Sequence, residues 1–245
     1  QNDFCDIPGA ALPVSGADAD LKRLAALINQ NLASIDAITL TLDSHYRIDI
    51  AHPGFWLQGD GAAVVPFTTI SADQVRTGQF RPRHEADLPW VLSYLDALHV
   101  RGRYLHMVWP VHCEIGTWGH ALHADLAAAV AQWEDYHGRQ ALRVFKGMNP
   151  WTEHYSALEA EVPLADDAAT QLNQGLLDRL AACDRLLIAG EAGSHCVRAT
   201  VQDVIRQVPA KRLCLLTDCI SPVTGFEQQQ QEFVHAMTQA GASLG

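Results

Sequence analysis

The hydrophobic positions along the chain follow two patterns. Short continuous apolar runs predict strands that are buried on both faces, whereas apolar positions three or four residues apart predict amphipathic helices. Predicted strands span residues 35–42, 104–108, 143–146, 186–189 and 213–217. Predicted helices span residues 21–28, 90–98, 122–133, 172–180, 196–208 and 226–237. Strands that alternate with helices indicate an α/β fold in three layers, with a parallel sheet between two layers of helices.

Two long segments interrupt this alternation. Residues 46–83 contain several prolines and glycines and show no clear periodicity, so we expect an irregular excursion, which in compact domains is usually functional. A second loop begins at Gly147. No repeat, low-complexity tract or linker divides the chain, and 245 residues suffice for one large α/β domain. We therefore expect residues 1–245 to form a single domain.

The start of the chain is unusual for such a sheet. It opens with the segment Gln1-Asn-Asp-Phe-Cys-Asp6, and no apolar run precedes this segment. A parallel sheet of this class normally begins with a buried apolar strand. We therefore expect that the first strand of the sheet is missing before residue 1.

Charge and cysteine usage argue against several classes of protein. The net charge of −11 disfavours nucleic acid and anionic membrane surfaces as partners. The six cysteines form no C-x-x-C pair, and Cys183 and Cys214 lie within apolar runs, so a reduced intracellular protein is favoured over a disulfide framework. We find neither a signal peptide nor an apolar run near the ~20 residues that a membrane span needs. We expect a cytoplasmic protein that binds neither nucleic acid nor a membrane.

A cysteine stands at a special point of the chain. The apolar run 186–189 is followed by the small residues Gly190, Ala192 and Gly193, and a helix begins at or just before Cys196. The thiol is thus predicted at a helix N-terminus, where the dipole and free N–H groups favour a thiolate. The same N–H groups can hold an oxyanion. The alternative is a buried core cysteine, a common fate of free cysteines.

Polar residues gather at the carboxyl ends of the predicted strands. They are Asp43, His45, His112, Lys146, Cys196 and Asp218. In an open α/β sheet, ligands bind along this edge, so the set predicts a functional site.

One carboxylate and three imidazoles in this region are candidate metal ligands. They are Asp43, His45, His52 and His112. Carboxylate and imidazole suit Zn, Fe or Mn and leave positions open for water or substrate. A D-x-H pair also occurs in solvated loops, and His52 is the least secure of the four.

Lys146 and two aromatic residues complete the candidates. Lys146 ends a strand that enters the core, where an ammonium needs a partner or a task. Beside a cysteine it would hold the thiol ionised, and beside a carboxylate it would form an ion pair; the alternative is a lysine that snorkels at a strand end. Trp109 and Tyr155 would form the sides of a pocket for a flat substrate or, alternatively, belong to the core.

Six blocks carry a resemblance to a known family. In order, they are Gln1-Asn-Asp-Phe-Cys5, Thr41-Leu-Asp-Ser-His45, Trp109-Pro-Val-His-Cys-Glu-Ile-Gly-Thr117, Phe145-Lys-Gly147, Tyr155-Ser-Ala157 and Ala189-Gly-Glu-Ala-Gly-Ser-His-Cys-Val197. Together they resemble the isochorismatase-like cysteine hydrolases, the superfamily that includes nicotinamidases. The resemblance spans essentially the whole chain and implies the three-layer isochorismatase-like hydrolase fold.

The resemblance also implies roles for particular residues. Cys196 matches the nucleophile and Lys146 the lysine of the catalytic triad. The backbone N–H groups of Ala192 and Cys196 would form the oxyanion hole, and the Glu191–Ala192 peptide bond would be cis. The third triad member, an aspartate, falls two positions before Gln1 and is absent here, and Asp3 matches a different aspartate of the opening motif.

The resemblance further implies a metal and a substrate class. Asp43, His45 and His112 resemble the ligands of a divalent metal ion, with His52 as an additional candidate; zinc is expected first, with iron or manganese as alternatives. Phe4, Trp109 and Tyr155 are expected to contact the substrate. The region from residue 52 to about residue 105 is longer than in compact nicotinamidases, which leaves the substrate open.

These inferences predict a metal-dependent cysteine amidohydrolase. It would cleave a small, nicotinamide-like carboxamide to a carboxylate and ammonia through a thioester, because relatives that hydrolyse isochorismate do so without a cysteine nucleophile. The alternatives are a non-catalytic, metal-binding member of the fold and a hydrolase of a different small substrate. The expected partner is a small-molecule amide, and we expect a homo-oligomer.

Overall fold

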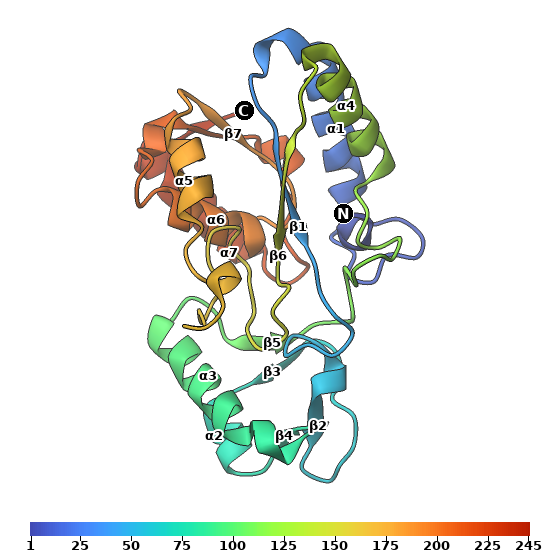
Figure 1. The fold of residues 1–245 in the computed structure, drawn as a ribbon, viewed down its shortest axis with the longest axis vertical. Coiled ribbons are helices and arrows are strands. Elements are labelled where there is room, and N and C mark those ends of the chain that lie inside the picture. Colours follow the sequence, from blue (N-terminus) through green and yellow to red (C-terminus); the bar gives the residue numbers. More distant parts are fainter.

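The computed structural model describes all 245 residues, which form a main body and a smaller lobe (Figure 1). In the main body, β1 pairs in parallel with β6, and β8 pairs in parallel with β7 on one edge and with β9 on the other. These strands are β1 (Thr39–Asp43), β6 (Leu142–Lys146), β7 (Leu186–Ile188), β8 (Leu213–Leu215) and β9 (Ser243–Leu244). The terminal strand β9 was not predicted from the sequence, because it is two residues long.

Helices cover both sides of these strands, as the alternation of patterns predicted. On one side lie α1 (Ala17–Gln30) and α4 (Ala124–His137), and on the other lie α5 (Gln174–Ala181), α6 (Cys196–Val204) and α7 (Glu227–Gln239) (Figure 1). Helices α1 and α4 pack against each other around the buried side chains of Leu21, Val130 and Trp133. The predicted three-layer α/β architecture is confirmed.

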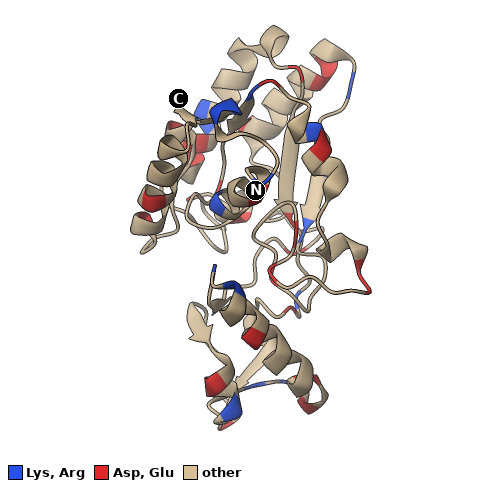
Figure 2. Cartoon of the chain, turned by 90° about the vertical axis from the view of Figure 1, so that its left-hand side faces the viewer, with Lys and Arg blue, Asp and Glu red and all other residues tan.

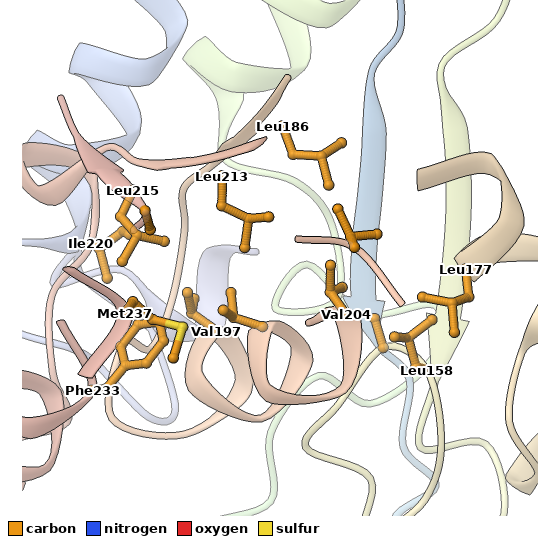
Figure 3. Close-up of a cluster of buried hydrophobic side chains, with 14 of the residues drawn as sticks. Leu158, Leu177, Leu186, Val197, Val204, Leu213, Leu215, Ile220, Phe233 and Met237 are labelled. Atoms are coloured by element: carbon orange, nitrogen blue, oxygen red, sulfur yellow. The ribbon is translucent and has the colours of Figure 1, made fainter. Parts of the chain in front are cut away.

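The second helical layer is held to β7 and β8 by one large apolar cluster. Burial of aliphatic side chains on this scale is the main favourable term in folding, at roughly 25 cal/mol per Å² of apolar surface. Figure 3 shows side chains from the strands and helices that meet in this cluster, among them Leu158, Leu177, Leu186, Val197, Val204, Leu213, Leu215, Ile220, Phe233 and Met237. The valines of α6 fall on one face of the helix, so the packing fixes how Cys196, at its first turn, is presented.

The sheet is interrupted between β1 and β7. Strand β1 pairs only with β6, and β7 pairs only with β8, so each has one edge without a strand neighbour. Gln1 lies at the carboxyl end of β1, where its side-chain amide donates to the carbonyl of Asp43 (2.7 Å) and accepts from the N–H of Asp43 (2.7 Å). Leu187 of β7 is 46% exposed, which is unusual for an apolar residue of an interior parallel strand.

Most of the segment expected to be irregular forms the smaller lobe. It contains β2 (Trp56–Gln58), β3 (Thr68–Ile70), α2 (Ala72–Arg76), β4 (Phe80–Pro82), α3 (Leu88–Arg101) and β5 (His106–Val108). Strands β2 and β4 are antiparallel, as are β3 and β5, around a core that includes Trp56, Val91 and Tyr94. Much of residues 46–83 is irregular, as expected, but the segment also contains β2, β3, α2 and β4. The expectation that the strand at residues 104–108 joins the parallel sheet is wrong, because β5 pairs antiparallel with β3.

Figure 2 shows this lobe standing apart from the main body, with acidic and basic residues interspersed along the chain. Short 3₁₀ helices connect the larger elements at Asn2–Phe4, Leu32–Ser34, Pro53–Phe55, Glu85–Asp87, Ala168–Thr170, Ala210–Arg212 and Thr217–Cys219. None of the helices combines the length and the apolar character that crossing a membrane requires.

Candidate active site

A pocket opens at the carboxyl ends of β1, β6 and β7, where the strand-end residues were expected to converge. Its walls are formed by Phe4, Leu12, Asp43, Trp109, His112, Glu153, Tyr155, Ala192, His195, Cys196 and Val223. The pocket therefore brings together segments from the first to the last quarter of the chain. Asp218, also predicted at this edge, is exposed and lies outside the pocket.

Cys196 is the first residue of α6, directly after the loop that follows β7. Its Sγ lies 3.5 Å from Nζ of Lys146. Burial raises the pKa of Cys196 to about 12, although the Lys146 ammonium opposes this shift. The expectation of a lowered thiol pKa is therefore wrong, because desolvation of the thiol outweighs the effect of the Lys146 charge.

The loop before Cys196 presents two unpaired backbone donors. The N–H groups of Ala192 and Cys196 have no hydrogen-bond acceptor within the chain. The loop is held by hydrogen bonds from the Gly190 N–H to the Cys219 carbonyl and from the Gly193 N–H to the Ser221 carbonyl, both 2.9 Å. The Glu191–Ala192 peptide bond is cis, as the resemblance implied. Two free donors at a helix start can hold a negatively charged oxygen.

Lys146 occupies a buried, fully paired position at the end of β6. Its Nζ forms an ion pair with Asp43, which is the residue paired with it across the β1–β6 ladder. It also donates to the carbonyl of His154 (2.7 Å). Burial lowers the pKa of Lys146, but the Asp43 carboxylate raises it above its usual range, so the ammonium remains charged. Of the two partners proposed from the sequence, a thiol and a carboxylate, Lys146 has both.

Asp43, His45 and His112 form a compact group of possible metal ligands. One ligand atom from each lies within 4.8 Å of the others, and all three residues are buried. The His45 Nδ1 lies 3.1 Å from Asp49 Oδ2, and the His112 Nδ1 lies 2.8 Å from the Pro110 carbonyl, so each ring has a polar partner on its Nδ1 side. The Nε2 atoms are left for ligation, which is the arrangement that metal-binding imidazoles commonly adopt. One carboxylate and two imidazoles fit a divalent metal ion such as zinc.

His52 lies beside this group but is not part of it. Its ring centre is 5.2 Å from those of His45 and His112. The Nδ1 is 3.1 Å from the Tyr46 carbonyl, and the Nε2 accepts a hydrogen bond from the N–H of His112 (3.4 Å). The side chain is therefore engaged at both nitrogens, and the structure favours the three-residue ligand set.

Aromatic side chains line the opposite part of the pocket. Trp109 donates from its indole N–H to the hydroxyl of Tyr155 (3.0 Å), which fixes the two predicted wall residues relative to each other. The ring of Phe4 lies edge-on to His112, with ring centres 5.5 Å apart. His195 packs against both Trp109 and Tyr155, and burial lowers its pKa to about 4, so its ring is neutral. These walls fit a flat, uncharged ring.

Sequence reasoning missed three polar residues of the site. Asp49, which is fully buried, accepts from the Ala51 N–H (2.9 Å) as well as contacting His45, and it raises the pKa of His45 to about 9 against the effect of burial. Glu153 and His195 line the pocket itself. A signal existed for Asp49, since a carboxylate within the apolar run Ile48-Asp-Ile-Ala51 needs a partner. His195 lies in the last of the resembling blocks, directly before Cys196, whereas Glu153 lies in a loop without a pattern.

Asp3 holds two loops together and is not part of the pocket wall. Its carboxylate accepts hydrogen bonds from the N–H groups of Ala11 (3.0 Å) and Cys113 (2.7 Å). It also packs so closely on Gly119 that a Cβ at that glycine would collide with it. The carboxylate thus ties the opening segment to the loop after β5 and does not line the pocket.

Comparisons with known proteins agree with the geometry. No protein-family model matches the chain. A nicotinamidase of Escherichia coli (strain K12) is 27% identical over 248 residues, which cover 100% of this chain and 90% of that protein.

Solved structures of similar fold include the yeast nicotinamidase (TM-score 0.66, 20% identity, 100% of this chain and 94% of that one). They also include a nicotinamidase/pyrazinamidase of Acinetobacter baumannii (TM-score 0.65, 21% identity, 100% and 90%). A third is the pyrazinamidase of Pyrococcus horikoshii in complex with zinc (TM-score 0.56, 19% identity, 100% and 93%). The chain therefore has the isochorismatase-like fold and is a relative of the nicotinamidases.

Proposed function

We propose that this protein hydrolyses a small, flat carboxamide of the nicotinamide class to a carboxylate and ammonia through a thioester on Cys196. The observation that carries the proposal is the placement of a cysteine thiol, two unpaired backbone N–H donors and a buried lysine around one pocket. The sequence similarity to a nicotinamidase supports the same chemistry.

The residues divide the reaction between them. Sγ of Cys196 attacks the carboxamide carbon, and the N–H groups of Ala192 and Cys196 receive the oxygen as it gains negative charge. The C–N bond then breaks, the nitrogen leaves as ammonia after gaining a proton, and the acyl group stays on sulfur. Water cleaves the thioester and releases the carboxylate. Lys146 favours the anionic sulfur electrostatically, because its ammonium lies 3.5 Å away.

The proton on Cys196 requires a base. Because burial raises the pKa of the Cys196 thiol, a carboxylate near Sγ would assist the reaction by accepting the proton. We propose that this carboxylate lies on an additional strand between β1 and β7. One observation supports the proposal: β1 and β7 each have one edge without a strand neighbour.

Asp43, His45 and His112 would hold a divalent metal ion, for which we propose zinc. When bound there, the ion would supply Lewis acidity toward a ring nitrogen or water. Asp43 is paired with Lys146 and also lies beside His112, so its carboxylate connects the lysine next to Cys196 with the possible metal ligands.

Ammonia release from nicotinamide and other small carboxamides tests the proposal. We expect turnover by the protein with its natural N-terminus and none by its Cys196→Ala variant, with equal metal content in both. A rival function, a non-catalytic metal-binding scaffold, predicts bound metal but no ammonia from any amide with either protein. That result would overturn the proposed amidase activity.

A further inference from the structure

Glu153 has a carboxyl oxygen that no other group in the chain uses. The side chain lies in the loop after β6, is 5% exposed and lines the pocket beside Cys196. Its Oε1 accepts a hydrogen bond from the N–H of His154 (2.9 Å), whereas its Oε2 is buried without any hydrogen-bond partner. A buried polar atom without a partner is energetically unfavourable, so such an atom on a residue that lines a pocket indicates a place for a ligand.

The backbone around Glu153 is anchored on both sides. Its N–H donates to the hydroxyl of Tyr94 (3.3 Å), a fully buried residue of α3 in the smaller lobe. Its carbonyl accepts from the N–H of Glu161 (2.7 Å). The carboxyl group is therefore held in place and is not a mobile surface side chain that happens to point inward. The smaller lobe contributes to the pocket through this contact.

The other polar groups of the pocket already have partners or assigned roles. The Ala192 and Cys196 N–H groups are donors and suit the carbonyl oxygen of an amide. Asp43, the only other carboxylate that lines the pocket, has one oxygen paired with Lys146 and the other 3.9 Å from His112 Nε2. A primary carboxamide also brings an NH₂ group with two donors, which need acceptors once water is excluded.

We propose that Glu153 is a specificity-determining residue whose Oε2 accepts a hydrogen bond from the carboxamide NH₂ of the substrate and disfavours the carboxylate product. The product has no N–H to donate and would place a negative oxygen against Oε2. Discrimination by an unfavourable contact of this kind is a common route to specificity. The inference rests on the proposed function and adds to it the basis for preferring amide over acid.

The test compares affinities for nicotinamide and nicotinate by calorimetry at about pH 8. Burial raises the pKa of Glu153 to about 7, so the carboxylate form predominates there. Cys196→Ala is the background, because it prevents turnover. Glu153→Gln keeps an acceptor for the amide and adds a donor for the acid. We expect its nicotinate affinity to rise about tenfold relative to its nicotinamide affinity.

Two further variants make the result decisive. Glu232→Gln removes an exposed carboxyl on α7 and should leave the ratio of the two affinities unchanged. Glu153→Asp keeps the charge but has a shorter side chain, so it should bind nicotinamide more weakly while its affinity for nicotinate stays low. This variant also replaces Glu153→Gln in the test if the latter fails to fold. A merely structural role would weaken both ligands equally and leave the ratio unmoved in both Glu153 variants, which would overturn the inference. If Cys196→Ala binds neither ligand, the proposed function fails, and the inference fails with it.

Discussion

The Nζ of Lys146 lies 3.5 Å from the Sγ of Cys196, although the two residues belong to different elements and stand 50 positions apart. Lys146 ends β6, and Cys196 begins α6. Their contact therefore depends on how the helical layer packs on the strands. Because Lys146 is also paired with Asp43, it links the thiol to the possible metal ligands.

Removal of the Lys146 charge should harm both activity and stability. Lys146→Met leaves the Asp43 carboxylate buried without its partner, a change that typically costs about 3–5 kcal/mol of unfolding free energy. We also expect amide turnover to fall by about 10²-fold or more, because the ammonium no longer favours the anionic sulfur. Urea unfolding and ammonia release measure the two effects. Lys211→Met, at an exposed lysine, should change neither; a fully active Lys146→Met protein would contradict the assigned role.

The metal group should depend on both histidines. We expect about one divalent ion per wild-type chain and none in the His45→Ala/His112→Ala double variant, measured by elemental analysis after dialysis against zinc. His235→Ala, at an exposed histidine, is the matched control and should retain the ion. Metal that persists in the double variant would place the site elsewhere in the chain.

Asp49 should act on the metal site through His45. Asp49→Asn keeps the shape of the side chain but removes the charge that faces His45 Nδ1. Loss of such a partner typically lowers metal affinity about 10–100-fold, which a competition titration with a chromophoric chelator will measure without reference to turnover. Asp36→Asn, at an exposed aspartate, should bind zinc as tightly as the wild-type protein. An unchanged affinity in Asp49→Asn would mean that His45 needs no such support.

A strand between β1 and β7 should supply both a base and stability. We expect protein with an apolar strand ending in Asp-x directly before Gln1 to release ammonia about 10²–10⁴-fold faster than protein that begins at Gln1, the usual range for general acid–base catalysis. Its thermal unfolding temperature should also rise, because the free edges of the two strands gain partners.

The matched control for this experiment carries the same strand with asparagine in place of its aspartate. It should restore the stability without restoring the turnover. Equal turnover by all three proteins would show that another group accepts the Cys196 proton.

Buried His106 should make the protein sensitive to acid. Burial lowers its pKa to about 4 from its usual value of 6.5, so between these values the unfolded chain binds more protons than the folded one. The stability that results is fully present above about pH 6.5 and is lost as the pH falls toward 4. We expect the urea-unfolding midpoint of His106→Gln to fall less between pH 6.5 and 4 than that of the wild-type protein. His84→Gln, at an exposed histidine, should follow the wild-type curve. The same slope in all three proteins would exclude His106 as a source of the effect.

Much of the site was predictable because local patterns report local structure. The apolar run before Gly190 and the valine spacing after Cys196 placed the thiol at a strand-to-helix junction, where the structure has it. The strand-end positions of Asp43 and Lys146 likewise indicated that they would converge, because parallel strands share one carboxyl edge. His112 reaches the same place from β5, which lies outside the parallel sheet. The resemblance of the ordered blocks indicated which side chains belong together.

Other features depended on contacts that no local pattern records. Strands β2, β3 and β4 of the smaller lobe lie in a segment with several prolines and glycines and no clear periodicity, so the sequence did not reveal them. The pKa of Cys196 depends on how deeply packing buries the thiol, and that burial outweighs the opposing charge of Lys146. The tasks of Asp49 and Glu153 likewise follow from partners distant in the chain or from the lack of one. Sequence periodicity determined where each element begins and which side it buries, whereas pairing partners and desolvation required the assembled tertiary structure, because both arise from contacts between distant segments.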